Sequence, residues 1–193
     1  MTRVSRFILV RHGESEGNRD RLFTHTPDVP LTGTGREQAR AAAALIAGRY
    51  QPTRLVASPF LRAWQTAEVL AEVLQLTVET DPAFREQSFG RLAGEPYEAL
   101  LVDPTYHSTP RWEWRPPGGE SLLDVLARVS PAFEQLAQAG DGRDIVLVSH
   151  GGVMLALWAY LAGGWEDARM TPNGGIVVVE HHNGTFRPPC SIS

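Results

Sequence analysis

Two short apolar segments with the same ending constrain the fold of this chain more than any other feature of its sequence. The apolar run at residues 7–10 is followed by His12, the run at residues 145–148 is followed by His150, and a glycine follows each histidine. A short continuous apolar run of this kind is typical of a strand that is buried on both faces of a parallel sheet. The sequence therefore predicts two central strands that each carry a histidine at the carboxyl end.

Helical stretches alternate with these and further strand candidates along the chain. We expect strands at 55–57, 77–79 and 176–179 as well, and helices at about 36–48, 59–74, 122–137 and 153–161. This alternation predicts an α/β fold, a three-layer α/β/α sandwich with a mostly parallel, mixed central sheet of about six strands. The length of 193 residues favours one domain that spans residues 1–193.

The second predicted helix has the clearest start signal. Ser58 is a candidate N-cap and Pro59 a candidate first helical residue. Arg62 then falls in the first turns, where the amide dipoles already favour an anion.

Charge and cysteine content indicate the class of partner and the compartment. The formal net charge is −4, which argues against nucleic acid or an anionic membrane as the partner and favours small molecules. One cysteine, Cys190, leaves no intramolecular disulfide, and the apolar run before Arg11 is too short for a signal core. We expect a cytoplasmic protein whose oligomeric state the sequence does not decide.

Ligands of open α/β sheets bind beyond the carboxyl ends of the strands, where both histidines should lie. Arg11 and Arg62 with His12 and His150 would give a tetrahedral dianion many charge-assisted hydrogen bonds, and a partly neutral histidine can attack phosphorus. Each residue also has a simpler interpretation, because strand-end histidines are often structural and helix arginines are often solvated. Spacing alone thus indicates an anion site.

The segment 89–120 differs from the rest of the chain. It is rich in proline and aromatic residues, and we interpret it as a crossover that lies over the pocket. Trp112 and Trp114 would share a face if their segment were extended, and would then serve either core packing or substrate binding. Arg91, Arg111 and Arg115 are candidates for binding an anionic tail of the substrate, although scattered arginines are usually solvated.

Six ordered segments stand out together along the chain. They are Val10-Arg11-His12-Gly13-Glu14-Ser15 with Asn18; Leu22-Phe23-Thr24 with Asp28-Val29-Pro30-Leu31-Thr32 and Gly35; Ser58-Pro59-Phe60-Leu61-Arg62-Ala63 with Gln65-Thr66-Ala67; Arg85-Glu86 with Phe89-Gly90; Pro117-Gly118-Gly119-Glu120-Ser121; and Val148-Ser149-His150-Gly151-Gly152. In order and spacing these segments resemble the histidine phosphatase superfamily in its phosphoglycerate-mutase-like branch, and the likeness runs from about residue 7 to 180.

The resemblance implies a role for each matching residue. His12 would be a nucleophile that is transiently phosphorylated, and Glu86 the proton donor. Arg11, Arg62 and a protonated His150 would bind the phosphoryl group. Further assignments follow the same likeness: Asn18 and Thr24 for substrate binding, and Ser58 and Glu120 for orienting the histidines. His25, which departs from the family pattern, is a further candidate for substrate binding, although a loop histidine is more often exposed at the surface. Neither a metal nor another cofactor is implied.

Departures from the family pattern limit what the resemblance implies about the substrate. His25 and Thr26 stand where a glycine and a tryptophan-like residue are usual, and the segment 89–94 lacks a common acidic-tryptophan pair. The region after it is shorter than in the glycolytic mutases, so hydrolysis of a small phosphorylated metabolite is favoured over phosphoglycerate mutase activity. Two further functions also remain open: an idle phosphate-binding or scaffolding module, and a metallohydrolase that uses the histidines as ligands.

Overall fold

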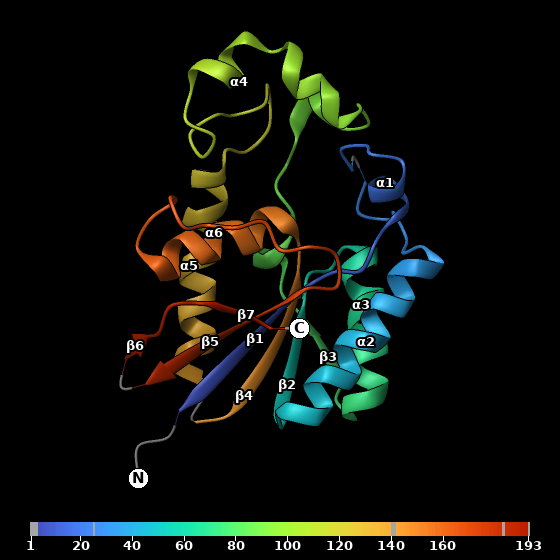
Figure 1. The fold of residues 1–193 in the computed structure, drawn as a ribbon, viewed down its shortest axis with the longest axis vertical. Coiled ribbons are helices and arrows are strands. Elements are labelled where there is room, and N and C mark those ends of the chain that lie inside the picture. Colours follow the sequence, from blue (N-terminus) through green and yellow to red (C-terminus); the bar gives the residue numbers. More distant parts are fainter. Residues whose placement is uncertain (1–3, 25, 140–141, 183, 193) are drawn as a thin grey trace.

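The computed structural model describes residues 4–24, 26–139, 142–182 and 184–192, which form a layered α/β molecule around one mixed sheet (Figure 1). The sheet of the described residues has seven strands in the order β3-β2-β4-β1-β5-β6, with β7 also paired to β5. The strands are β1 Ser5–Arg11, β2 Pro52–Ala57, β3 Val78–Thr80, β4 Asp144–Ser149, β5 Ile176–His182, β6 Thr185–Phe186 and β7 Cys190–Ile192. The predicted fold class is confirmed.

Strand direction divides the sheet into two parts. β1, β2, β3 and β4 run parallel to one another, whereas β5 pairs antiparallel with β1, β6 and β7. Because β5 runs against β1, the residues that precede β5 lie at the edge of the sheet where β1 ends. This edge contains the candidate site.

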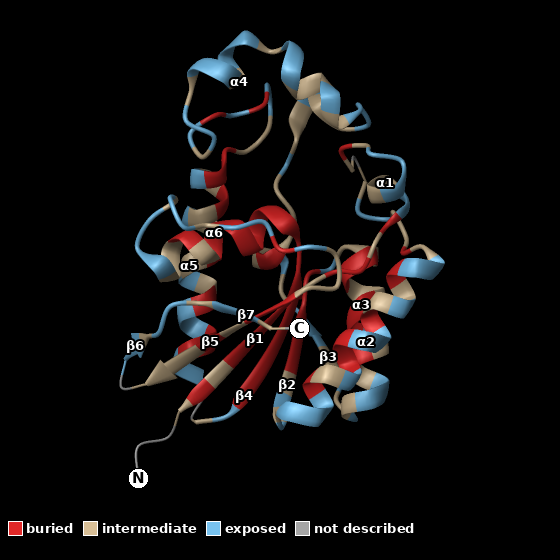
Figure 2. Cartoon of the chain, in the orientation of Figure 1, coloured by how far each residue is buried: buried red, intermediate tan, exposed pale blue. Residues whose placement is uncertain are grey.

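Helices cover both faces of the sheet, which produces the three layers. The helices are α1 Glu16–Arg19, α2 Gly33–Arg49, α3 Leu61–Leu74, α4 Pro104–Ser108, α5 Leu122–Ala139 and α6 Gly151–Ala162. α2 and α3 pack on one face and α5 and α6 on the other, and the buried residues lie in the central strands and on the inner helix faces (Figure 2). Within the described residues, no helix has both the length and the apolar character needed to cross a bilayer.

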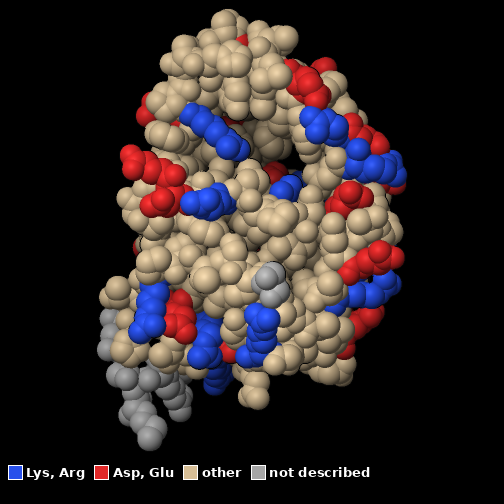
Figure 3. Space-filling view, in the orientation of Figure 1, with Lys and Arg blue, Asp and Glu red and all other residues tan. Residues whose placement is uncertain are grey.

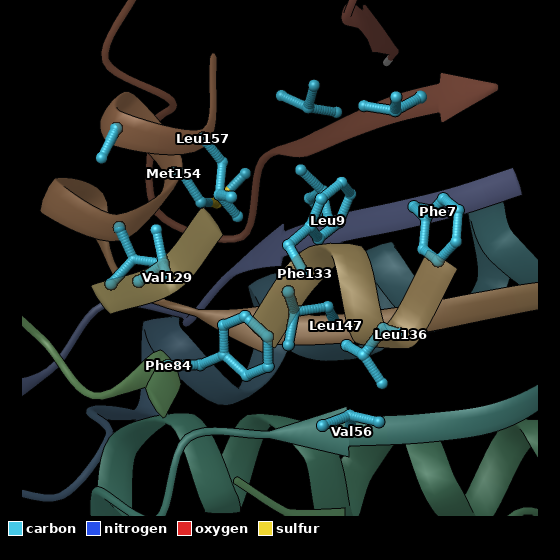
Figure 4. Packing of buried hydrophobic residues seen from close by; sticks show 14 of the residues in the cluster. Phe7, Leu9, Val56, Phe84, Val129, Phe133, Leu136, Leu147, Met154 and Leu157 are labelled. Carbon is cyan, nitrogen blue, oxygen red and sulfur yellow. The ribbon is translucent and has the colours of Figure 1, made fainter. Parts of the chain in front are cut away.

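The alternation of side chains along β1 supplies both apolar cores. Phe7 and Leu9 join the core under α5 and α6, where Phe133 packs edge-on against Phe7 at 5.0 Å between ring centroids (Figure 4). Ile8 and Val10 join the core under α2 and α3. Burying each such side chain contributes roughly 1.5–3 kcal/mol. A run that is apolar at every position therefore fixes a central strand.

The start of α3 differs from the prediction. The helix begins at Leu61 with Phe60 as the N-cap, and no side chain caps it. The expected assignment of Ser58 as N-cap and Pro59 as first helical residue is wrong, because the helix begins two residues later than Pro59. The Ser58 hydroxyl accepts from the Phe60 amide and also lies within hydrogen-bond distance of His150. Arg62 still lies in the first turn of α3.

Residues 89–120, which we call the cap, arch over one end of the sheet (Figure 1). The cap contains the 3-10 helices η2 Gly90–Leu92 and η3 Tyr97–Val102 as well as α4, while η1 Pro82–Phe84 precedes it. Trp112 lies in a turn, and the amides of Glu113 and Trp114 both donate to the Pro110 carbonyl. The segment is therefore not extended, and the condition for a shared face is not met. Trp112 stacks on Trp165 at 5.9 Å between ring centroids, and Trp114 packs edge-on against Tyr106.

Candidate active site

Strand pairing brings the two strand-end histidines together. β1 and β4 pair in parallel with Arg11 opposite Ser149, and the His12 amide donates to the Ser149 carbonyl over 2.9 Å. The two imidazole rings then lie 5.1 Å apart between centroids and are almost fully buried, with 2% of His12 and 0% of His150 exposed. Two histidines that are 138 positions apart in sequence therefore share one site.

A single backbone contact decides which nitrogen of His12 is free to react. Nδ1 lies 2.6 Å from the Gly13 carbonyl, which can only accept, so Nδ1 carries the proton and Nε2 keeps its lone pair. Burial lowers the pKa of His12 well below its usual value, and the guanidinium groups of Arg62 and Arg11 lower it further. His12 is therefore a neutral imidazole with Nε2 available as a nucleophile.

Two arginines line the same cavity as this imidazole, and each has one buried donor nitrogen without a partner. Among the described residues, Nε of Arg11, Nη1 of Arg62 and Nδ1 of His150 are buried nitrogen atoms without a hydrogen-bond partner. Burial lowers the pKa of both arginines, which Glu86 partly offsets, but a guanidinium stays protonated. Buried donors normally have partners, so their common position indicates a site built for an oxygen-rich anion.

Ser58 determines the orientation and tautomer of His150. Its hydroxyl lies 2.7 Å from Nε2 of His150 and also accepts from the Phe60 amide at 3.3 Å. The hydroxyl accepts from Phe60 and has one proton to donate. If that proton goes to Nε2, then Nδ1 carries the proton of a neutral His150.

The expectation that His150 is protonated is not supported by its surroundings. Burial lowers the pKa of His150 well below its usual value, and Arg62, His12 and Arg11 add to the effect. The imidazole is neutral at pH 7 in these surroundings, with Nδ1–H as a neutral donor. A phosphate dianion beside it would raise this pKa again.

Glu86 lies on the same cavity as His12, on an irregular segment before the cap. Its Oε1 accepts from the amide of Gln87 at 2.9 Å and from that of Gly152, at the start of α6, at 3.1 Å. A Cβ at position 152 would lie 2.8 Å from Oε1, so a glycine is needed for this approach. These two hydrogen bonds hold Oε1 in place.

A cavity of about 400 Å³ extends from the two arginines and His12 to the cap. Figure 3 shows a hollow between the arch of the cap and the rest of the molecule, with basic side chains near its margin. Its outer wall is aromatic, with Phe23, Phe89, Tyr97, Tyr106 and Trp114. Arg111 also lines it, whereas Arg115 pairs with Asp124 over 2.7 Å. The cavity thus joins an anion-binding end to an aromatic end.

The three residues expected to bind substrate have different positions. Asn18 lines the cavity, but its Oδ1 accepts from Ser15 and Asn173, and its amide nitrogen donates to Tyr97 over 3.1 Å. Asn18 therefore ties α1 to the cap as well as bordering the site. Thr24 lines the same cavity. His25 lies outside the described residues.

Glu120 does not contact either histidine, contrary to what the resemblance suggested. Its carboxylate accepts from Arg85, from Arg128 and from the Ser88 amide at distances of 2.9 to 3.1 Å. Burial by itself would raise the pKa of Glu120, but hydrogen bonds from Arg128 and Ser88 outweigh it and leave this pKa below its usual value. The residue holds the segment that carries Glu86.

Sequence reasoning missed the segment that closes the site from the β5 side. The Thr171 carbonyl accepts from Arg11 over 2.7 Å, and the Asn173 amide nitrogen donates to the His12 carbonyl over 3.1 Å. The signal was the turn sequence Thr-Pro-Asn-Gly-Gly before an apolar strand. It was missed because the sequence does not show the direction of β5. Only a strand that runs antiparallel to β1 begins at the edge of the sheet where β1 ends.

Metal-ligating groups do not gather in the same way. Within the part of the chain that the structure describes, no group of three or more His, Cys, Asp or Glu side chains is arranged to hold a metal ion. His12 and His150 are instead accompanied by Arg11 and Arg62, which repel a cation.

A comparison with family models supplies the deciding observation. The model of the histidine phosphatase superfamily, branch 1, matches residues 7–189. The chain belongs to the histidine phosphatase superfamily. It is a phosphatase of the histidine phosphatase type, which confirms the family that the sequence motifs indicated.

Relatives of this histidine phosphatase support the assignment along nearly the whole chain. A glucosyl-3-phosphoglycerate phosphatase of Mycolicibacterium vanbaalenii is 37% identical over 173 residues, which cover 83% of this chain and 76% of that protein. The structure named mycobacterial hydrolase 1 has a TM-score of 0.87 at 30% identity and covers 98% of this chain and 100% of its own. Mycobacterial glucosyl-3-phosphoglycerate phosphatase in complex with VO3 has a TM-score of 0.85 at 29% identity, with 97% of each chain covered.

Proposed function

We propose that this phosphatase hydrolyses a small phosphorylated sugar without a metal ion, through a phosphohistidine on His12. The observation that carries the proposal is the neutral His12 imidazole. Its Nδ1 is held by the Gly13 carbonyl, so Nε2 is a free nucleophile beside two arginines with unpartnered donors. No deprotonation is needed before attack, because the lone pair is already present.

The reaction would proceed in two displacements. In the first, Nε2 of His12 forms a bond to phosphorus, the bond from phosphorus to the ester oxygen breaks, and Glu86 gives its proton to the departing alkoxide. In the second, water attacks the phosphohistidine while Glu86 takes up a proton, the bond from phosphorus to nitrogen breaks, and inorganic phosphate leaves. Arg11, Arg62 and the Nδ1–H of His150 would stabilise the charge on the equatorial oxygens.

Arginine provides the charge neutralisation that a metal ion supplies in other phosphoryl-transfer enzymes. Arg62 is 2% exposed, and its guanidinium also lies 5.2 Å from the Phe60 ring centroid, which keeps it in place. Two fixed guanidinium groups match the charge of a phosphoryl dianion and disfavour a divalent cation at the same point. These groups support a mechanism that does not depend on metal.

The aromatic end of the cavity supports a sugar as the leaving group. Tyr97, Tyr106 and Trp114 combine flat apolar faces with polar atoms, a combination that suits a ring with both C–H and hydroxyl groups. The name of the relatives, glucosyl-3-phosphoglycerate phosphatase, points to the same class of phosphorylated sugar. We also propose that the enzyme acts in the cytoplasm and binds neither nucleic acid nor membranes.

The decisive experiment looks for phosphate on the nucleophile. We expect mass spectrometry after a rapid acid-free quench to find phosphate on His12 during turnover. His12→Ala should abolish hydrolysis, a loss of at least about 10³-fold, with an unchanged circular dichroism spectrum. Phosphate on another residue, or turnover by the alanine variant, would refute the mechanism.

The competing functions predict different outcomes in two further assays. A metallohydrolase would lose activity when a chelator is added, whereas we expect phosphate release from sugar phosphates to continue. A phosphoglycerate mutase would isomerise 3-phosphoglycerate faster than it releases phosphate. An idle phosphate-binding module would bind inorganic phosphate but turn over none of a panel of sugar phosphates.

A further inference from the structure

Arg128 uses its side chain to hold the backbone next to Glu86. It lies on α5, and its side chain is only 15% exposed. Nη1 donates to the carbonyls of Ala83 and Arg85, over 2.6 and 3.0 Å. Nε and Nη2 donate to the two carboxylate oxygens of Glu120, over 3.1 and 3.0 Å. One partly buried side chain therefore connects a helix, an irregular segment and the end of the cap.

Glu120 completes the contact on the other side of Glu86. Its carboxylate accepts from Arg85 and from the Ser88 amide, both over 2.9 Å, and its backbone carbonyl accepts from the Gln87 side chain over 2.6 Å. Arg85, which precedes Glu86, is thus bound by both Glu120 and Arg128. Gln87 and Ser88, which follow Glu86, are bound by Glu120.

This clamp is needed because residues 85–89 belong to neither a helix nor a strand. A segment without regular hydrogen bonds keeps its position only through side-chain and turn contacts. The Glu86 side chain reaches outside its own segment through the hydrogen bond from the Gly152 amide to Oε1. A small shift of the segment would thus move the proton-donating oxygen away from the ester oxygen without disturbing His12.

We propose that Glu120 and Arg128 are positioning residues that place Glu86 for proton transfer to the leaving group. This inference rests on the proposed role of Glu86 as the acid. The pair touches neither the substrate nor the phosphate site. Its effect should therefore fall on leaving-group departure and not on binding of the phosphoryl group.

The test compares substrates that differ in their need for an acid. Arg128→Lys keeps the charge but loses the planar guanidinium, whose nitrogens bond Glu120 and the carbonyls of Ala83 and Arg85. For glycerol phosphate, whose alkoxide must be protonated, kcat/KM should fall by at least about tenfold. For p-nitrophenyl phosphate, whose leaving group needs little protonation, the loss should stay below about threefold. Equal losses on both substrates would overturn the proposal.

A matched control comes from another forked ion pair of the same kind. Arg54 donates to both carboxylate oxygens of Glu79, over 3.0 and 2.7 Å, between β2 and β3. Arg54→Lys should leave both kcat/KM values unchanged. A selective loss in this control would mean that any damaged ion pair impairs proton transfer, which also overturns the proposal.

Glu86→Gln separates failure of this inference from failure of the proposed function. It should itself lose more activity on glycerol phosphate than on p-nitrophenyl phosphate, and equal losses would remove Glu86 from the acid role. If Glu86→Gln is selective but Arg128→Lys is not, only the positioning role fails. In the Glu86→Gln background, adding Arg128→Lys should cause no further selective loss.

A milder variant covers the case in which Arg128→Lys does not fold. Arg85→Ala removes one hydrogen bond to Glu120 from a side chain that is 40% exposed. Circular dichroism should show a folded protein, with a smaller selective loss on glycerol phosphate of about threefold. No selective loss in any folded variant of the cluster would exclude the positioning role.

Discussion

The hydroxyl of Ser58 does two things that its position before a proline does not suggest. It is fully buried, it accepts from the Phe60 amide, and it lies within hydrogen-bond distance of Nε2 of His150. When Nε2 accepts from this hydroxyl, Nδ1 carries the proton and is the donor that we propose for the phosphoryl group. The ring orientation and the tautomer of His150 thus depend on one oxygen atom.

Ser58→Ala should weaken both stability and phosphate binding. Loss of the partner leaves a buried nitrogen unsatisfied, which costs about 1–3 kcal/mol in the free energy of unfolding measured with urea. The inhibition constant of inorganic phosphate should rise by about tenfold. Ser58→Thr should restore part of the stability and part of the phosphate affinity. Ser108→Ala, at an exposed position on α4, should change neither quantity. Unchanged phosphate affinity in Ser58→Ala would contradict the tautomer assignment.

Burial of the two neutral histidines makes stability depend on pH. Their folded pKa values are lowered, whereas an unfolded histidine titrates near about 6.5. Above about pH 6.5 both states are neutral and the full stability is present. Below about pH 6.5 the unfolded chain binds protons that the folded protein does not bind. The free energy of unfolding therefore decreases, by up to about 1.4 kcal/mol per pH unit for each histidine, until the pH reaches the folded pKa.

Urea unfolding between about pH 8 and about pH 5 measures this slope. His150→Asn should reduce it, and His107→Asn, at an exposed position in the cap, should not. Saturating inorganic phosphate should make the slope shallower, because a bound dianion raises both pKa values. A slope that is the same in the wild type and His150→Asn would refute the assignment of a buried neutral His150.

At the scale of elements, the approach of α2 to the end of β1 determines where His12 lies. A Cβ on Gly13 would lie 2.2 Å from the Gly35 carbonyl, and a Cβ on Gly35 would lie 2.1 Å from the Glu14 carbonyl. In both cases the added Cβ would meet a backbone carbonyl, which cannot move unless the surrounding backbone moves with it. Two glycines thus let a helix start against the loop that follows His12, the proposed nucleophile.

Gly35→Ala should therefore force α2 away from this loop. We expect a loss of about 3 kcal/mol or more in the free energy of unfolding, together with a fall in kcat. Gly48→Ala, in the same helix, meets no atom within 4 Å. This control should be neutral or stabilise the protein by up to about 1 kcal/mol, because alanine has the higher helix propensity. Equal effects of the two substitutions would show that the close approach is unimportant.

At the scale of the whole molecule, the sheet with its two cores holds the phosphate site, and the cap holds the aromatic wall. The cap is attached beside α1, where Phe23 exchanges backbone hydrogen bonds with Gly94 and Glu95 over 2.7 and 2.9 Å. Both parts line one cavity, which supports our proposal that residues 1–193 act as a single domain. Substrate selection should then be separable from phosphoryl chemistry.

Trp114→Ala tests this separation. Trp114 lines the cavity, and its indole nitrogen donates to the Thr105 hydroxyl over 3.0 Å. We expect KM for sugar phosphates to rise by about tenfold while the inhibition constant of inorganic phosphate stays unchanged. Trp112→Ala removes a tryptophan of the same cap that stacks on Trp165 instead, and should leave KM unchanged. A similar rise in the inhibition constant of inorganic phosphate would contradict the separation of substrate selection from phosphoryl chemistry.

The sequence by itself determined the layers of the fold and the centre of the site. Apolar runs at residues 7–10 and 145–148 are typical of strands buried on both faces, and helical patterns between strands require a layered α/β arrangement. Parallel strands end at one edge, so the sequence predicts that His12 and His150 meet there. These properties follow from local periodicity and from the geometry of a parallel sheet, which need no knowledge of distant contacts.

Only the tertiary structure decided the parts that depend on the direction of a strand or on one side-chain partner. Asn173 joins the site because β5 runs antiparallel, and Glu120 bonds Arg128 rather than a histidine because α5 brings that guanidinium beside the segment that carries Glu86. Ser58 contacts both the Phe60 amide and His150, and the second contact forms only because the chain brings β4 beside β2. Such choices are made between residues far apart in sequence, and local patterns carry no information about them.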